Sequence, residues 1–268
     1  MRSYPRNRLT DRSGARPVVT KAARSRGYTI SYEDAGVGQV IVLITGATMS
    51  AADWRDAGYV DTLADDHRVL SVDPLGNGLS DKPRDPEAYG WPDVAGDVLA
   101  VMDAADVGRA VLWGYSRGGR LAAAFAAENP DRAAALIVHD AELEDVARGT
   151  PIPAHVAALM AGDFGPMWAD FGFSEDDRRY DEEVNDPRAL GGLWAGLRRS
   201  GSTIDVGRIV APTLVIKARD DDLDLAGTLA ESLDADLEVM PGLDHLEAFS
   251  RLDLVVPIVR RFLEPIGL

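Results

Sequence analysis

Short runs of apolar residues recur along the chain, and each ends in glycine or in polar residues. The stretch "RGYTISYEDAG" alternates around Tyr28, Ile30 and Tyr32, as a strand with one buried face does. The later runs are continuously apolar, which is typical of strands buried on both faces. They occupy residues 39–46, 69–72, 109–116, 132–140, 212–217 and 235–240. The pattern therefore predicts a sheet whose inner strands are covered on both sides.

Segments with helical spacing lie between these predicted strands. They span residues 93–107, 117–130, 226–235 and 253–263. Strands that alternate with helices predict right-handed crossovers and a mostly parallel sheet flanked by helices, which is an α/β fold. Residues 141–208 interrupt the alternation, because they are polar and helical without a clear strand. We expect a core formed by residues 27–140 and 209–268, with 141–208 inserted as a small helical lid.

Charge is unevenly distributed along the chain. The protein has 268 residues and a net charge of −16, yet its first 26 residues carry eight basic side chains against one acid. We expect residues 1–26 to be a basic, disordered tail. The strongly acidic remainder would repel phosphates, which argues against nucleic acid as a partner.

Composition excludes several kinds of chemistry. The chain contains no cysteine, so disulfides, thiolate metal sites and cysteine nucleophiles are excluded. No run approaches the roughly 20 apolar residues of a membrane span, and the first residues lack the apolar core of a secretory signal. No acidic or histidine cluster has metal spacing, and no glycine-rich phosphate loop follows a strand. We expect a cytoplasmic protein that needs no metal or cofactor.

The sequence "VLWGYSRGGRL" runs from a predicted strand directly into an alanine-rich predicted helix. Its Gly-x-Ser-x-Gly spacing, Gly114 to Gly118, is typical of a nucleophile elbow, a sharp turn that exposes the serine hydroxyl. Glycine is expected two residues to either side of Ser116, because a Cβ there would collide with neighbouring backbone. By itself this pattern is weak, so its context matters.

Other polar groups follow the predicted strands at the same edge of the sheet, where the functional groups of α/β proteins gather. Asp140 follows the strand after the elbow helix, and Asp220 and Asp221 follow the next one. The loop "PGLDH" brings His245 after the last strand. The chain order serine, aspartate, histidine is the order that nucleophile-elbow enzymes use.

These motifs together resemble the α/β-hydrolase family from about residue 27 to the end. They are "GYSRGG", "DPLGNGLSDKP", "NPDR" before "AALIV", "PTLVIKARDDD" and "GLDH". The resemblance implies that Ser116 is the nucleophile, His245 the general base and Asp221 the acid that orients it. Asp140 is the alternative acid, since some members of the fold carry it at that position, and Asp220 is a near neighbour.

The resemblance also implies an oxyanion hole made by the backbone N–H groups of Ala47 and Arg117. The family usually has His-Gly where this chain has Thr45-Gly46, and that histidine mostly supports the loop. The shape of the oxyanion loop is therefore open.

Aromatic side chains in the lid are candidates for contact with substrate, or equally for the core of the lid. They are Trp168, Trp194 and Phe171.

A serine hydroxyl becomes nucleophilic when an imidazole takes its proton and a carboxylate fixes the imidazole. We therefore expect a cofactor-independent serine hydrolase that cleaves a small-molecule carboxylic ester or lactone through an acyl-serine. Two alternatives stay open. One is a C–C bond hydrolase or haloperoxidase-like perhydrolase with the same triad, and the other is a ligand-binding signalling protein with little turnover. The sequence gives neither the substrate nor the oligomeric state.

Overall fold

A computed structural model describes residues 17–143, 151–201, 204–218 and 223–267. Its centre is an eight-stranded sheet with the order β1-β2-β4-β3-β5-β6-β7-β8. Neighbouring strands from β4 to β8 run parallel, whereas β1 pairs antiparallel with β2 and β2 with β4. The strands are β1 (Val19–Ser25), β2 (Tyr28–Gly36), β3 (Gln39–Ile44), β4 (His67–Val72), β5 (Ala110–Tyr115), β6 (Ala133–His139), β7 (Thr213–Lys217) and β8 (Asp236–Val239). The predicted α/β fold with a mostly parallel sheet is confirmed.

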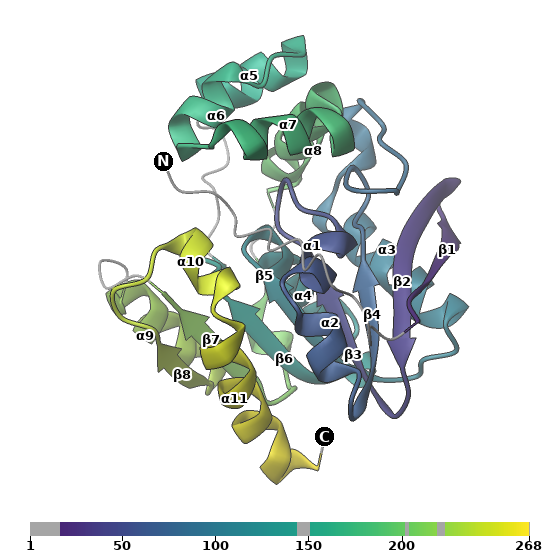
Figure 1. Ribbon diagram of the computed structural model, residues 1–268, viewed down its shortest axis with the longest axis vertical. Helices are drawn as coiled ribbons and strands as arrows, with labels where there is room; N and C mark the ends of the chain where they lie inside the picture. The colour runs from purple at the N-terminus through teal and green to yellow at the C-terminus, as the bar shows by residue number, and fades with distance from the viewer. Residues whose placement is uncertain (1–16, 144–150, 202–203, 219–222, 268) are drawn as a thin grey trace.

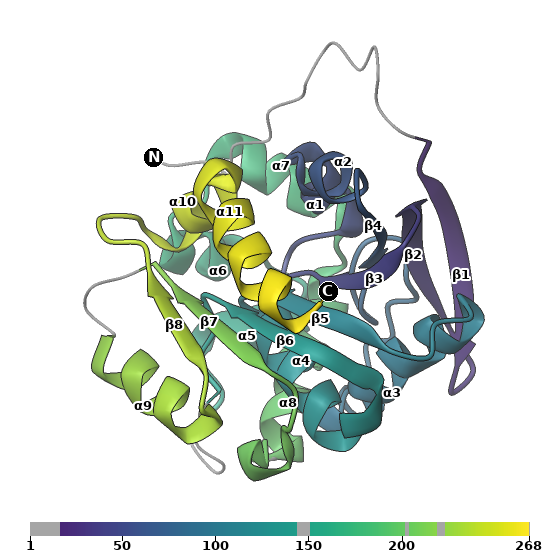
Figure 2. The same ribbon diagram turned by 90° about the horizontal axis from the view of Figure 1, so that it is seen from below.

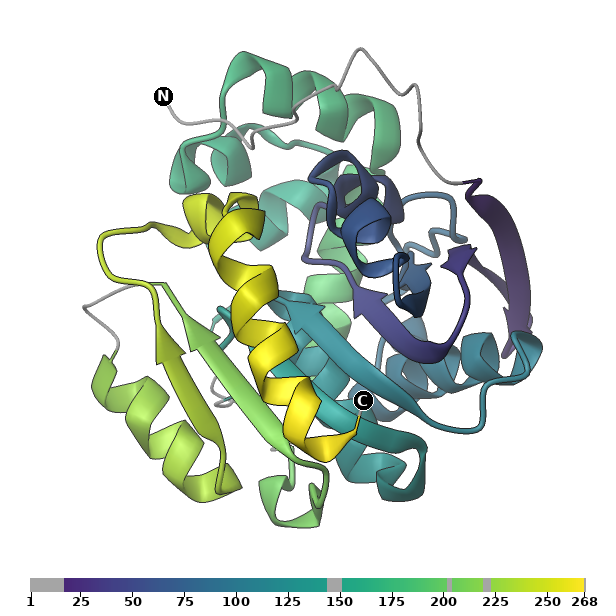
Figure 3. The same ribbon diagram turned by 60° about the horizontal axis from the view of Figure 1, so that its bottom comes forward.

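The continuous apolar runs form the inner strands because both faces of the sheet are covered. All residues of β5 and β6 are buried. One face packs against α3 (Trp91–Ala104), α4 (Arg117–Glu128) and α9 (Leu223–Leu233). The other packs against α1 (Ala51–Asp56), α2 (Tyr59–Leu63), α10 (His245–Ser250) and α11 (Leu252–Leu263). Figure 2 shows these two helical layers on opposite sides of the strands, and Figure 3 shows α11 lying along the face of the sheet.

The first strand corrects the predicted tail boundary. Residues 19–25 form β1 at the edge of the sheet, in the stretch expected to be disordered. Most side chains of β1 are exposed, so no alternation of apolar and polar positions marked it. Its basic residues have acidic neighbours, since Lys21 pairs with Asp34. Just after the strand, Arg26 makes a two-pronged ion pair with the buried Asp97. Residues 1–16 lie outside the described part of the chain.

Four helices occupy the stretch between β6 and β7, and we call residues 154–200 the insertion. They are α5 (Ala154–Ala161), α6 (Gly165–Phe171), α7 (Glu175–Val184) and α8 (Pro187–Ser200). Figure 1 shows them together at the top of the molecule, apart from the layers that flank the sheet. They have a small apolar core of their own around Leu159, Phe164, Met167, Phe173 and Leu190. No strand lies in the part of this stretch that the structure describes, residues 151–201 and 204–212, in agreement with the sequence pattern.

Candidate active site

Ser116 lies at the junction of β5 and α4, in a backbone conformation that few residues adopt. Its φ is 55° and its ψ is −127°, a strained combination for a residue with a side chain. A Cβ added to Gly114 would come within 2.0 Å of the carbonyl oxygen of Gly118. A Cβ added to Gly118 would come within 2.2 Å of the carbonyl oxygen of Ile44. The two glycines therefore have the steric role that the sequence analysis assigned to them.

His245 joins the serine to a carboxylate. Its Nε2 lies 3.0 Å from Ser116 Oγ, and its Nδ1 lies 2.6 Å from Asp140 Oδ2. The three residues are far apart in the chain, and the ends of β5 and β6 and the start of α10 bring them together. An imidazole held in this way accepts a proton at Nε2 while Nδ1–H donates to the carboxylate. The arrangement can activate the serine hydroxyl.

Asp140 is almost fully buried and is held from several sides. Its Oδ1 accepts a hydrogen bond from the Ala218 N–H at 3.2 Å and lies 3.6 Å from Lys217 Nζ. Burial opposes ionisation of this carboxyl group. The hydrogen bond and charge of His245, with help from Lys217 and Ala218, outweigh burial, so the pKa of Asp140 lies below its ordinary value. The group is thus a carboxylate at neutral pH.

The structure favours the alternative acid over the preferred one. Asp140 occupies the position beside His245 Nδ1, which has only one proton to donate. Asp220 and Asp221 lie outside the described residues. The preference for Asp221 rested on the family resemblance of "PTLVIKARDDD". The position of Asp140 after the strand that follows the elbow helix was recognised, but the sequence did not show its positive φ of 48°, which turns the chain sharply at that point.

The loop expected to contribute to an oxyanion hole, residues 45–50 and called the oxyanion loop below, lies directly against Ser116. A Cβ added to Gly46 would be 3.5 Å from Ser116 Cβ. Thr45 is fully buried, and its hydroxyl has no hydrogen-bond partner among the residues that the structure describes. The Ala47 N–H follows in this loop, and Arg117 begins α4, where the first N–H groups have no partner within the helix. Of the two backbone donors predicted for an oxyanion hole, Arg117 follows Ser116 in the chain, and Ala47 follows Gly46, which lies against Ser116.

Two side chains that the sequence analysis did not single out support this loop. Asn77 Nδ2 donates to the carbonyl oxygens of Ala47 and Met49 at 2.8 Å each, and lies 3.3 Å from that of Gly46. Arg117 Nη2 lies 2.7 Å from Asn77 Oδ1 and 3.1 Å from Gly46 O. Burial lowers the pKa of Arg117 to about 10, so the guanidinium remains charged at neutral pH. The position of Asn77 in "DPLGNG", just after β4, was the available signal.

Asp73 organises the turn that carries Asn77. Its carboxylate accepts hydrogen bonds from the N–H groups of Ala51 at 2.6 Å and Leu79 at 2.9 Å. Ser80 Oγ donates to the Asp73 carbonyl and accepts from the Ser31 N–H. Burial raises the pKa of Asp73 to about 6. This aspartate links the turn after β4 to the start of α1 and to β2, so its role is structural.

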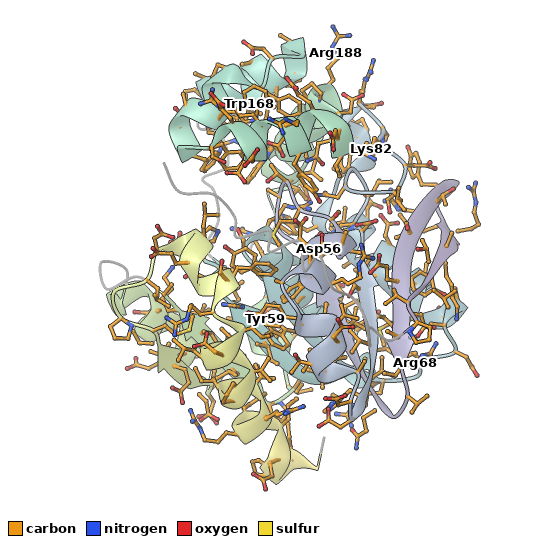
Figure 4. All side chains as sticks on the ribbon, viewed as in Figure 1. Asp56, Tyr59, Arg68, Lys82, Trp168 and Arg188 are labelled. Carbon is orange, nitrogen blue, oxygen red and sulfur yellow. The ribbon has the colours of Figure 1, made fainter. Side chains whose placement is uncertain are left out.

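An aromatic layer underlies His245. Tyr115 stacks on the His245 ring with the ring centroids 5.0 Å apart, and its hydroxyl donates to the His245 carbonyl. Behind it lies His139, which is fully buried, and burial lowers its pKa to about 4. His139 is therefore neutral near pH 7. Tyr59, labelled in Figure 4, belongs to the same layer and donates to the Phe249 carbonyl.

The insertion contacts the oxyanion loop directly. The Tyr180 hydroxyl donates to Asp53 Oδ2 at 2.7 Å and shares a 2.6 Å hydrogen bond with Ser50 Oγ. Asn185 Nδ2 donates to the Thr48 carbonyl at 2.9 Å. These contacts fix α7 and the turn after it to the loop that follows β3, so the insertion lies over the site.

The three aromatic candidates for substrate contact have different surroundings. Trp168 lies among the insertion helices (Figure 4), stacks on Phe164 and donates its indole N–H to Asp181 at 2.9 Å. Trp194 is partly buried between the insertion core and the main core. Phe171 is 53% exposed. The surroundings of Trp168 fit the core of the insertion, and contact of any of the three with substrate stays a prediction.

Within the described ranges, no group of three or more histidine or acidic side chains could hold a metal ion, and no helix is long and apolar enough to cross a membrane.

Comparison with known proteins identifies the fold family. The family model described as alpha/beta hydrolase fold matches residues 39–185, which is more than half of the chain. The chain belongs to the α/β hydrolase fold family. Among solved structures, this hydrolase is similar to the enol-lactonase from Burkholderia xenovorans, with a TM-score of 0.77 and 22% identity over 91% of this chain and 100% of that one.

Other relatives of this α/β hydrolase are named for different substrates. An N-acyl homoserine lactone degrading enzyme has a TM-score of 0.73 and 25% identity over 90% of this chain and all of that one. The 2-hydroxymuconate semialdehyde hydrolase of a Pseudomonas species is 30% identical over 125 residues, 46% of this chain and 43% of that protein. The chain spans about two fifths of the length of the curated relatives it matches. The comparisons thus support a hydrolase without defining its substrate.

Proposed function

We propose that this protein is a serine hydrolase that cleaves a small carboxylic ester or lactone through an acyl-Ser116 intermediate. The observation that carries the proposal is the continuous hydrogen-bonded relay from Ser116 Oγ through His245 to Asp140. Similarity to two lactone-cleaving enzymes supports the substrate class. A serine rather than a carboxylate at position 116 argues against the epoxide-hydrolase chemistry of other structural neighbours.

Acylation would begin with attack of Ser116 Oγ on the carbonyl carbon of the substrate. His245 Nε2, 3.0 Å away, takes the hydroxyl proton as the new C–O bond forms. Asp140 stabilises the resulting imidazolium through Nδ1–H and keeps the ring in the required tautomer. His245 then gives the proton to the departing alkoxide. With a lactone, that alkoxide stays attached to the acyl group at its other end.

The negative charge on the former carbonyl oxygen would be stabilised by the N–H groups of Ala47 and Arg117. Removing one such donor typically lowers the rate by about 10² to 10³. In the second half of the reaction, water attacks the acyl carbon and His245 Nε2 takes a proton from it. The histidine returns that proton to Ser116 Oγ as the acyl C–O bond breaks, which releases a carboxylic acid.

The first experiment is intact mass spectrometry after exposure to a small fluorophosphonate. The parent protein is expected to gain a single adduct, and Ser116→Ala is expected to gain none. Hydrolysis of 4-nitrophenyl acetate and of a panel of lactones should fall by at least about 10⁴ in the same variant. Ester turnover that survives in both Ser116→Ala and His245→Ala would overturn the proposal. A folded parent that forms no adduct would favour a ligand-binding protein on this fold.

A C–C bond hydrolase is the second candidate, because a curated relative at 30% identity cleaves 2-hydroxymuconate semialdehyde. The same serine would add to a carbonyl carbon, the aldehyde in this substrate, and the departing carbon would take the proton as the C–C bond breaks. Comparing kcat/KM for 2-hydroxymuconate semialdehyde with that for simple lactones separates the two candidates. A clear preference for the semialdehyde would replace the ester or lactone assignment and would retain the triad.

A further inference from the structure

The side chain of Arg117 is an unusual feature of the elbow. It directly follows the proposed nucleophile and is 9% exposed, and the one ionisable group that interacts with it among the described residues is Tyr89, not a carboxylate. Its two hydrogen bonds go from Nη2 to neutral acceptors, Gly46 O and Asn77 Oδ1, and its Nε is buried without a partner among those residues. A buried cation without a counterion is costly, so a merely structural arginine is a poor explanation for it.

The acceptor that Arg117 contacts is the informative detail. Gly46 O belongs to the peptide group whose nitrogen is that of Ala47, the second donor of the expected oxyanion hole. No peptide bond among the described residues is cis, so in this peptide the N–H points opposite to the C=O. Holding the oxygen toward Arg117 and Asn77 therefore turns the Ala47 N–H away from them. Gly46 itself lies against Ser116.

The hydrogen bonds to this loop are unequal. Asn77 Nδ2 has three carbonyl oxygens within reach but only two N–H bonds to donate, and Gly46 O is the most distant of the three at 3.3 Å. Arg117 makes the shorter contact with Gly46 O, at 3.1 Å. Thr45 offers no alternative support, because its hydroxyl has no partner among the described residues. The guanidinium is thus the main support of the peptide between Gly46 and Ala47.

We propose that the Arg117 side chain, together with Asn77, is a positioning element for the oxyanion hole. Arg117 would contribute twice: its backbone N–H is one donor, and its side chain orients and polarises the peptide that carries the other. A charged donor on a peptide oxygen strengthens the hydrogen bond that the same peptide makes through its N–H. This inference rests on the proposed acyl-serine chemistry.

The test compares Arg117→Met with Arg120→Met. Arg120 is a matched control, because it is a buried arginine of the same helix whose guanidinium lies over Trp91, 5.0 Å from the ring centroid. With 4-nitrophenyl acetate, Arg117→Met is expected to lower kcat by about 10- to 100-fold and to leave KM within about twofold. Arg117→Lys should recover part of the loss. Arg120→Met should keep kcat within about threefold of the parent, even if both methionine variants melt at lower temperature.

Affinity for a transition-state mimic separates positioning from general damage. 2,2,2-Trifluoroacetophenone adds to an active serine and places an oxyanion in the hole. Its inhibition constant should rise in Arg117→Met by the same factor by which kcat/KM falls. An unchanged inhibition constant, an unchanged kcat, or an equal loss in Arg120→Met would overturn the proposal. If Arg117→Met does not fold, Asn77→Ala removes the residue that contacts both the Arg117 guanidinium and Gly46 O, and the same results are expected.

A readout that does not need turnover keeps this inference separate from the proposed function. Amide hydrogen exchange of the segment 45–50 should be faster in Arg117→Met than in the parent and unchanged in Arg120→Met. A parent that neither hydrolyses 4-nitrophenyl acetate nor reacts with a fluorophosphonate would overturn the acyl-serine proposal alone. Unchanged exchange in Arg117→Met would overturn the positioning role, whatever the activity.

Discussion

Replacing Asp140 with asparagine should nearly abolish turnover while the fold stays intact. In the parent, Asp140 Oδ1 accepts from the Ala218 N–H and faces Lys217 Nζ, whereas Oδ2 accepts from His245 Nδ1. The Ala218 and Lys217 donors require an oxygen, so the amide nitrogen of the new side chain must face His245. An amide N–H there stabilises the imidazole with its proton on Nε2, and that nitrogen then cannot accept the proton of Ser116.

The size of the effect follows from this change of tautomer. An aspartate-to-asparagine change at the acid of a Ser-His-Asp triad lowers kcat by about 10⁴, which is about 5 kcal/mol of transition-state stabilisation. We expect a loss of that order in kcat for 4-nitrophenyl acetate, and a comparable slowing of fluorophosphonate labelling. Circular dichroism and thermal melting should detect a folded protein.

Asp221→Asn is the matched control, because the family resemblance makes Asp221 the rival acid. It should retain more than about a third of the parent kcat. The reasoning is refuted if Asp140→Asn keeps more than about a tenth of the parent activity, or if Asp221→Asn shows the 10⁴-fold loss instead. Either result would mean that the hydrogen bond between Asp140 and His245 is not the one used in catalysis.

Three further predictions concern stability. Gly118→Ala should prevent folding or lower the melting temperature by more than 10 °C, because the new Cβ would lie 2.2 Å from a backbone oxygen. Gly96→Ala is the control and should raise the free energy of unfolding by roughly 0.5 to 1 kcal/mol, because its Cβ would meet nothing within 4 Å. Burial raises the pKa of Asp73 from 3.8 to about 6, so the native state binds the carboxyl proton more tightly than the unfolded state does. The free energy of unfolding should therefore fall by about 3 kcal/mol as the pH rises from 3.8 to about 6. Asp73→Asn should remove that slope in urea titrations at a series of pH values. Tyr180→Phe should expose the insertion to faster limited proteolysis and lower the free energy of unfolding by about 1 to 3 kcal/mol, because the bonds to Asp53 and Ser50 are lost; unchanged cleavage would argue against this contact as an anchor.

The strands and the elbow could be predicted because their signals are local. Runs such as 133–138 are apolar throughout, and only a sheet covered on both faces buries them fully. The Gly-x-Ser-x-Gly spacing follows from a steric requirement that two glycines meet. The edge strand β1 was missed because an exposed edge places little constraint on its side chains, and the short helices α1, α2 and α10 were missed because five or six residues give too little periodicity.

The choice of acid and the support of the oxyanion loop depended on tertiary contacts. Asp140 and Asp221 both follow strands at the same sheet edge, and only the three-dimensional path of the chain gives one of them the bond to His245. Arg117 and Asn77 are 40 residues apart, and nothing in either local stretch indicates that they meet beneath Gly46. Contacts between residues so far apart in the sequence depend on the register of the sheet and on the path of the loops above it.

The adjacency of β5 and β6 has a consequence for how this enzyme could diversify. Tyr115 pairs with His139 across the two strands, and the Ser116 N–H donates to the His139 carbonyl, so the sheet itself joins the proposed nucleophile to the proposed acid, Asp140. The insertion begins after Ser116 and Asp140 in the chain, and His245 lies in α10, after the insertion. Residues 154–200 could therefore be exchanged for the corresponding segment of another hydrolase as a cassette. Such an exchange would change specificity while Ser116, Asp140 and His245 keep their places, if the new segment replaces the hydrogen bonds that Tyr180 and Asn185 make to the loop after β3.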